Sequence, residues 1–158
     1  MDDDRRKHLE LIQGVITRLA GNSFSIKGWA VGLVAIMGGL AAKDADLRFA
    51  AALLFPTFCF WGLDAYYLRQ ERLYRKLYEK AVAGDANAPV FSLNPSPFES
   101  EVKGIGSVAF SPTIRWVHTP ILAFVIVLMA YTAFKPPKPD TAVIPVKPVG
   151  SASQSKAQ

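Results

Sequence analysis

The sequence predicts an all-α membrane protein with three transmembrane helices. Apolar residues gather in three long blocks, basic residues flank these blocks, and a proline-rich segment follows the last one. The apolar fraction of 51% is modest as an average, so it is the segregation into blocks that distinguishes this chain from a globular protein. A soluble enzyme is therefore not expected.

Residues 1–22 are predicted to form a cytoplasmic amphipathic helix. Apolar residues recur at helical spacing on one stripe: Leu9, Ile12, Ile16 and Leu19. Such a stripe can pack on the protein itself or lie in the headgroup plane, and we expect a mixture of both. Gly21-Asn22-Ser23 predicts the end of this helix, because glycine and asparagine favour helix stops. The acidic N-terminus does not resemble a cleavable signal peptide.

Residues 23–80 are predicted to form a transmembrane hairpin whose first span is Ile26 to Ala42. This block is interrupted only by Lys27, and its length corresponds to about 26 Å of helix. Small residues share one face of the block and predict a seam for close helix packing: Gly28, Gly32, Ala35 and Gly39. The alternative is that glycine is simply common in membrane helices.

The second span is predicted from Leu47 to Leu68, with a kink at Pro56. No helix breaker follows until after Lys80, so one helix of about 35 residues should project from the membrane into the cytoplasm. An apolar and aromatic stripe continues along the projecting part. Its members are predicted to contact neighbouring subunits: Tyr67, Leu73, Tyr74, Leu77 and Tyr78.

The remainder of the chain divides into three parts. Residues 81–115 are rich in glycine, proline and asparagine, and we expect a small, partly β cytoplasmic loop. Residues 116–134 are the third predicted span, with Trp116 and Tyr131 near its ends as interfacial aromatics. Residues 135–158 are predicted to be a disordered, proline-rich periplasmic tail.

The distribution of basic residues predicts the orientation. Three spans place the N-terminus and the 69–115 region on one side of the membrane, and that side carries twelve lysines and arginines against six on the other. The more basic side is the cytoplasmic one in bacterial inner membranes. The N-terminus is therefore expected in the cytoplasm and the C-terminus in the periplasm.

Asp64 is the polar residue of greatest interest, because an acid within a span is costly and often functional. It can pair with Lys27 or Arg69 at the cytoplasmic boundary, form a bond between subunits, or carry protons or cations. We favour the boundary pairing, since no second acid accompanies Asp64 inside the membrane.

The sequence contains no pattern typical of catalysis, metal binding or cofactor binding. His8 and His118 are far apart, and we expect His118 at the headgroup level. The single cysteine, Cys59, lies in an apolar block and cannot form an intrachain disulfide. No nucleic-acid motif accompanies the net charge of +5. No catalytic residue, metal, cofactor or nucleic acid is therefore expected.

Residues 5–80 contain the stretch FWGLDAYYLRQERLYRKLY, which runs from Phe60 to Tyr78, preceded by the region from Gly28 to Ala45 and the pair Phe55-Pro56. On these residues the chain resembles the RipA-family octameric membrane proteins of bacteria, and the stretch from Phe60 to Tyr78 is the most specific part of the resemblance. The resemblance implies a homo-oligomer of the cytoplasmic membrane, of eight subunits, without established enzymatic activity. The later loop and third span are similar only in general layout.

We therefore expect a non-enzymatic homo-oligomeric inner-membrane protein that forms a ring or scaffold. One alternative is a channel or membrane-disrupting effector gated through its cytoplasmic loop, but no span has a polar stripe that could line a pore. Another is an accessory subunit of a larger membrane complex. The expected partners are membrane lipids, further copies of the chain and, for the last alternative, another membrane subunit.

Overall fold

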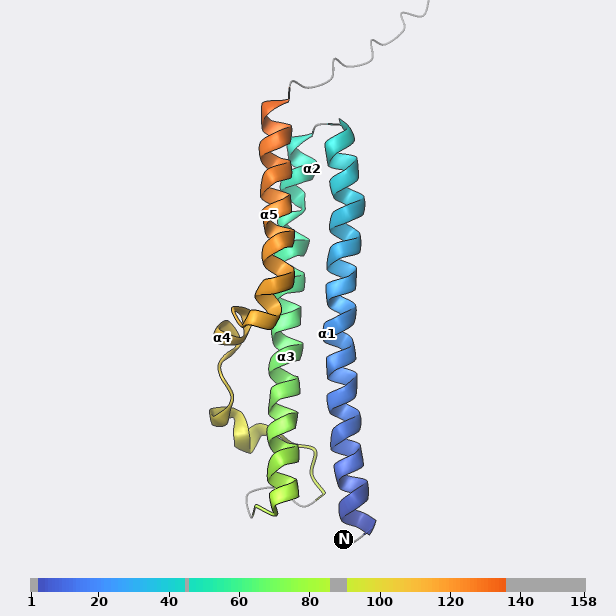
Figure 1. Ribbon diagram of the computed structural model, residues 1–158, viewed down its shortest axis with the longest axis vertical. Helices are drawn as coiled ribbons and strands as arrows, with labels where there is room; N and C mark the ends of the chain where they lie inside the picture. Colours follow the sequence, from blue (N-terminus) through green and yellow to red (C-terminus); the bar gives the residue numbers. More distant parts are fainter. Residues whose placement is uncertain (1–2, 45, 86–90, 136–158) are drawn as a thin grey trace, which may run out of the picture.

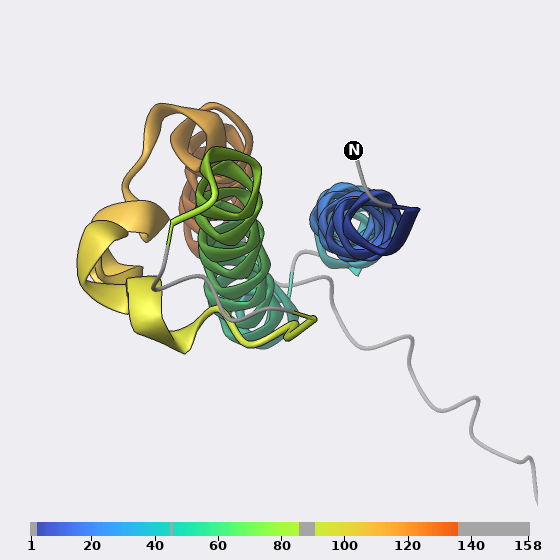
Figure 2. The same ribbon diagram turned by 90° about the horizontal axis from the view of Figure 1, so that it is seen from below.

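Three long helices, placed side by side, form the framework of the protein. A computed structural model describes residues 3–44, 46–85 and 91–135. The elements in chain order are α1 (Asp3–Asp44), α2 (Leu47–Ala52), α3 (Leu54–Ala83), the 3₁₀ helix η1 (Ser96–Glu101), α4 (Ile105–Ala109) and α5 (Pro112–Phe134). Figures 1 and 2 show α1, α3 and α5 running along a common direction, with η1 and α4 beside α3.

Three helical segments are long and apolar enough to cross a membrane: Asp3–Lys43, Leu47–Ala83 and Pro112–Phe134. Their outer faces carry large apolar side chains that the protein itself leaves uncovered, including Trp29, Ile36, Phe55, Trp116 and Val127. Lipid tails can solvate such surfaces, whereas water cannot do so without a large cost. The fold is that of a multi-pass membrane protein. The start of α1 and the end of α5 lie at opposite ends of the bundle (Figure 1).

The prediction of a separate N-terminal amphipathic helix is wrong. α1 continues for 42 residues through Gly21-Asn22-Ser23 and into the first span, as one helix in Figure 1. A glycine inside a helix costs only about 1 kcal/mol relative to alanine. The packing of Ile12, Ile16 and Ser23 against other elements buries all three side chains. These tertiary contacts outweigh the local preference for a helix stop.

The second predicted helix is interrupted next to its proline. α2 ends at Ala52 and α3 begins at Leu54. Pro56 has no N–H to donate to the carbonyl group of Ala52, four residues earlier. Near this missing bond, the N–H of Leu53 points back to the carbonyl groups of Ala50 and Ala51. Regular helical hydrogen bonding resumes where the N–H of Thr57 donates to the carbonyl group of Leu53. The structure thus places the interruption in the turn before Pro56.

The prediction of a partly β loop is also wrong. Within 81–85 and 91–115, the described part of that loop, there is no strand. Pro95 precedes η1, and Pro97 lies in its first turn. Val108 and Ala109 belong to α4. A strand needs a neighbouring strand to satisfy its backbone groups, and this helical fold offers none in its described part.

Apolar clusters among the described residues hold the helices together, and two of them join α1 to the other elements. The first lies between the spans and consists of Ala30, Val34, Ala41, Ala50, Leu53, Ile121, Val125 and Leu128. The second joins the N-terminal half of α1 to the C-terminal half of α3 and to η1; it consists of Ile12, Ile16, Leu77 and Phe98. Figure 1 shows these two half-helices extending side by side beyond the start of α5, as the open end of the hairpin that α1 forms with α3.

The end of α3 is held by side chains from distant segments. Gly84 ends the helix in the left-handed conformation, with φ of 71°, and Arg5 donates hydrogen bonds to the carbonyl groups of Ala81 and Val82. Lys80 lies 3.2 Å from Glu101 of η1 and 3.3 Å from Asp85. The Lys80 ammonium donates hydrogen bonds to the carboxylates of Glu101 and Asp85, and these bonds raise the pKa of Lys80 above its ordinary value. This tether fastens η1 to the hairpin.

Candidate functional site

Four polar side chains from three helices meet in the interior of the bundle: Ser23 and Lys27 of α1, Asp64 of α3 and His118 of α5. The Lys27 ammonium is 2.6 Å from Oδ1 of Asp64, and the Ser23 hydroxyl donates to the same oxygen at 2.5 Å. The Nε2 atom of His118 is 3.0 Å from Oδ2 of Asp64. A single carboxylate therefore connects all three spans.

The local sequence of α1 explains how two of these groups reach Asp64 together. Ser23 and Lys27 are four residues apart, so they lie on the same face of the helix one turn from each other. Lys27 donates to the Ser23 hydroxyl at 2.7 Å and to Asp64 at 2.6 Å. The lysine and serine thus form a connected pair of donors on one face of α1.

Aromatic side chains close the cluster on the side of α3 and α4. The Trp61 ring lies one turn before Asp64 and stacks on the His118 ring, with centroids 5.8 Å apart and planes inclined by 11°. The Trp61 Nε1–H donates to the carbonyl oxygen of Ala109 at 2.9 Å. Because this bond fixes the indole against α4, it also fixes the surface on which the imidazole lies.

The cluster is almost completely withdrawn from solvent. Asp64 and His118 have no exposed side-chain surface, and Lys27 retains only 19%. A buried ion pair gains little net stability, but loss of one partner leaves a charge without compensation and is strongly destabilising. One polar atom of the cluster is left unpaired. The Nδ1 atom of His118 is buried and has no hydrogen-bond partner in the described part of the chain.

The sequence predicts that Asp64 pairs with Lys27 or Arg69, and the structure treats these two partners differently. Lys27 and Asp64 are in direct contact. Arg69 does not join them: its Nε atom is buried and has no hydrogen-bond partner among the described residues. His118, which was expected at the headgroup level, has its side chain fully buried within the protein against Asp64. Rotation of α5 about its axis decides this, and the third apolar block alone does not indicate it.

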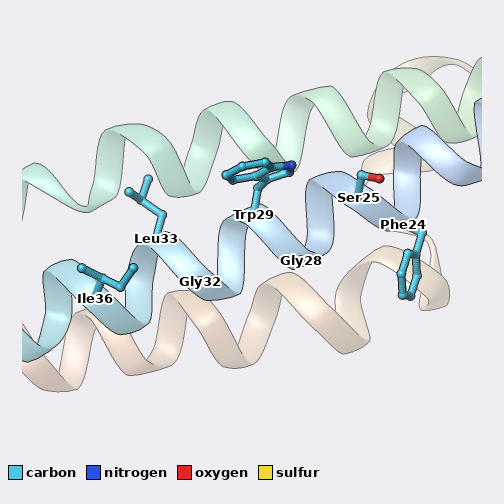
Figure 3. A pocket seen from close by; sticks show the side chains of 7 residues that line it. All are labelled: Phe24, Ser25, Gly28, Trp29, Gly32, Leu33 and Ile36. Carbon is cyan, nitrogen blue, oxygen red and sulfur yellow. The ribbon is translucent and has the colours of Figure 1, made fainter.

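The small-residue seam lies on the outside of α1. Gly28, Gly32, Ala35 and Gly39 are all exposed. A Cβ atom added at any of the three glycines would meet nothing within 4 Å. A shallow groove of about 370 Å³ accompanies the first two glycines. Figure 3 shows Gly28 and Gly32 as bare helical turns with Phe24, Trp29, Leu33 and Ile36 projecting around them.

The residues predicted to contact other subunits have two different locations. Leu73 and Leu77 are buried within the protomer, at 1% and 0% exposure. Tyr67, Tyr74 and Tyr78 are half-buried, and the last two pack beside Leu77. The leucines therefore serve packing within the chain, and only the tyrosine edges remain accessible to a neighbour.

Sequence reasoning did not identify Ser23, His118 or Gly38 as members of the packed interior. The four-residue spacing of Ser23 and Lys27 was an available signal for the first. No comparable signal exists for His118. A Cβ atom at Gly38 would lie 3.0 Å from Cε1 of Phe124, whereas one at any of the three seam glycines would meet nothing within 4 Å. Gly38 is therefore a small residue at which α5 closely approaches α1.

Chemistry at the cluster is confined to its carboxylate, ammonium, hydroxyl and imidazole groups. The described residues contain no group of three or more histidine, cysteine, aspartate or glutamate side chains that could hold a metal ion. Comparison with protein-family models, with curated proteins and with solved structures finds no match to this chain.

Proposed function

We propose that this protein is a non-enzymatic, homo-oligomeric protein of the bacterial inner membrane, which forms a ring or scaffold. The observation that supports self-association best is the exposed seam of Gly28, Gly32, Ala35 and Gly39 on α1. Small residues at this spacing let two membrane helices approach closely. The small size of the three glycines serves no contact within the protomer, since each has open space around its Cβ position. A second copy of the chain is the proposed occupant.

The projecting hairpin supplies the platform of this proposal. The N-terminal half of α1 and the C-terminal half of α3 extend past the start of α5 (Figure 1), and an apolar cluster around Ile12 and Leu77 holds them together. The excess of lysine and arginine on this side supports a cytoplasmic location for the hairpin. The resemblance of residues 5–80 to the RipA family supports an assembly of eight subunits.

The arrangement of polar groups favours a scaffold over a channel. A pore needs polar side chains distributed along the length of the spans. In the described spans, Ser23, Lys27, Asp64 and His118 instead gather in one cluster. The buried hydroxyl of Thr57 is satisfied by the carbonyl group of Leu53 in its own helix.

Mass measurement in nanodiscs tests this proposal. The unaltered protein is expected at an integer multiple of its 17.3 kDa chain mass, with eight copies as the expected number. Gly32→Leu places a large side chain on the seam and should reduce the mass to smaller species. Gly62→Leu is the matched control, because Gly62 is an exposed glycine of α3 with nothing within 4 Å of its Cβ position.

A monomeric unaltered protein would overturn the proposal. An assembly that Gly32→Leu leaves intact would overturn the role of the seam. Ion flux in liposomes carrying the intact assembly would favour the channel alternative.

A further inference from the structure

We propose that Nδ1 of His118 is a proton-binding site inside the membrane bundle, with Asp64 as its counter-charge and Trp61 as its cover. This site goes beyond the scaffold proposal and does not depend on it, since all three residues belong to one protomer. The observation that carries it is a buried imidazole nitrogen without a partner, on a ring whose other nitrogen contacts a carboxylate.

The hydrogen-bond pattern assigns the protons of the cluster. Oδ1 of Asp64 accepts from the Ser23 hydroxyl and from the Lys27 ammonium, which is the arrangement of an ionised carboxylate beside a cation. Oδ2 is then also an acceptor, so His118 must present Nε2–H to it. In a neutral imidazole the other nitrogen carries a lone pair. Nδ1 is therefore free to accept a proton.

Proton uptake at this atom is chemically simple. A hydronium ion gives its proton to the Nδ1 lone pair and leaves a water molecule, no bond in the chain breaks, and the ring becomes an imidazolium that carries one positive charge. The carboxylate of Asp64, 3.0 Å from Nε2, stabilises this charge. The stacked indole of Trp61 adds a favourable contact between a cation and an aromatic face.

The charged groups around the imidazole are few. α3 contributes Asp64, and α1 contributes Lys27, which reaches the cluster through the same carboxylate. α4 has no titratable residue in its sequence IGSVA. Arg48 of α2 and Arg115 of α5 are exposed. The proton on His118 therefore makes the cluster net positive, while without it the Lys27–Asp64 pair is neutral.

The protonated state differs from the unprotonated one in a way that affects the fold. An added Nδ1–H becomes a buried donor with no acceptor among the described residues, and such a donor is unfavourable until it reaches water or another acceptor. Proton binding should therefore loosen the start of α5, where Pro120 has already removed one helical hydrogen bond. The site couples the proton concentration to the packing of α5.

Trp61 provides a direct measurement. The protein with Trp29→Phe and Trp116→Phe, in liposomes, retains Trp61 as its single tryptophan. A stacked imidazolium accepts an electron from excited indole, so emission should fall in one step when the pH is lowered and the imidazole takes up its proton. His118→Gln should abolish the fall, because glutamine retains an N–H donor for Asp64 but has no titratable nitrogen. His8→Gln, which removes the other histidine, should leave it unchanged.

Emission that does not change with pH, or a fall that persists in His118→Gln, would overturn the proposal. Should His118→Gln not fold, ¹⁵N spectra of histidine-labelled protein with His8→Gln decide the question on the unaltered site. The expected result is an Nε2–H tautomer at neutral pH and protons on both nitrogens in acid. An Nδ1–H tautomer at neutral pH would equally overturn it.

Discussion

Asp64 and His118 are 54 residues apart in the sequence, yet a 3.0 Å contact joins their side chains in the fully buried centre of the bundle. The same carboxylate binds Lys27 on its other oxygen. Asp64 thus links α5 and α1 through α3, at the level where the third span begins. This one acid therefore contacts a side chain of each of the other two spans.

Replacement of Asp64 by alanine should be among the most damaging single substitutions. It leaves the Lys27 ammonium buried without a counter-charge, and we expect a loss of about 3–5 kcal/mol in the free energy of unfolding. Unfolding in mixed micelles, followed by circular dichroism, measures this loss. The double variant Lys27→Met, Asp64→Leu removes both charges and should recover most of it. A double variant as unstable as Asp64→Ala would contradict the view that the uncompensated ammonium is the cause.

Substitution by leucine should affect protomer stability at Gly38 and assembly at Gly39. At Gly38 the new side chain collides with Phe124, whose Cε1 lies 3.0 Å from the Cβ position, and such overpacking costs about 1–3 kcal/mol. At Gly39 nothing lies within 4 Å, so the protomer should keep its stability and only the assembly should suffer. Thermal unfolding and mass in nanodiscs separate the two effects. Phe124→Ala should relieve Gly38→Leu; failure to do so would place the collision elsewhere.

Adjacent residues of α1 should differ in their importance for the projecting hairpin. Ile12 is fully buried and Leu11 is 60% exposed. Ile12→Ala opens a cavity beside Leu77 and Phe98 and should cost about 2–5 kcal/mol. Leu11→Ala should change stability by less than about 0.5 kcal/mol. Limited proteolysis of the hairpin and denaturant unfolding provide the comparison. Equal sensitivity of the two variants would mean that Leu11 is covered by a neighbouring chain.

The Lys80 tether should contribute to stability in a pH-dependent way. Because its folded-state pKa is raised above the ordinary 10.5, the contribution is complete below that value and disappears as the pH rises through the raised pKa. Unaltered protein should therefore melt at a higher temperature than Lys80→Met at neutral pH. The difference should vanish at strongly alkaline pH. If the difference in melting temperature stays constant from neutral to strongly alkaline pH, then η1 is supported by the methylene stem of Lys80 and its charge does not contribute.

The two errors about secondary structure have a common origin. Gly21-Asn22-Ser23 favours a helix stop locally, and the glycine- and proline-rich 81–115 region favours extended or turn conformations locally. In the fold, Ser23 faces Asp64 inside a continuous α1, and Val108 packs with Ala65 and Ile114 from within α4. In both segments tertiary contacts outweigh local preferences of about 1 kcal/mol or less.

The prediction of three helices suited to cross a membrane followed from composition and block length, because solvation by lipid tails depends on those quantities alone. The missing N–H of proline predicted a kink at Pro56, and the structure instead divides the helix in the turn before it. The sequence also marked Lys27 and Asp64 as the polar residues of the spans.

Only the tertiary structure decided which faces meet. The rotation of each helix about its axis turned His118 and Ser23 inward, gave the close contact with Phe124 to Gly38, and left Gly28 and Gly32 on the outside. These choices depend on how side chains from three separate segments fill one space together. Such packing is a property of the assembled helices, and no single segment of sequence contains it.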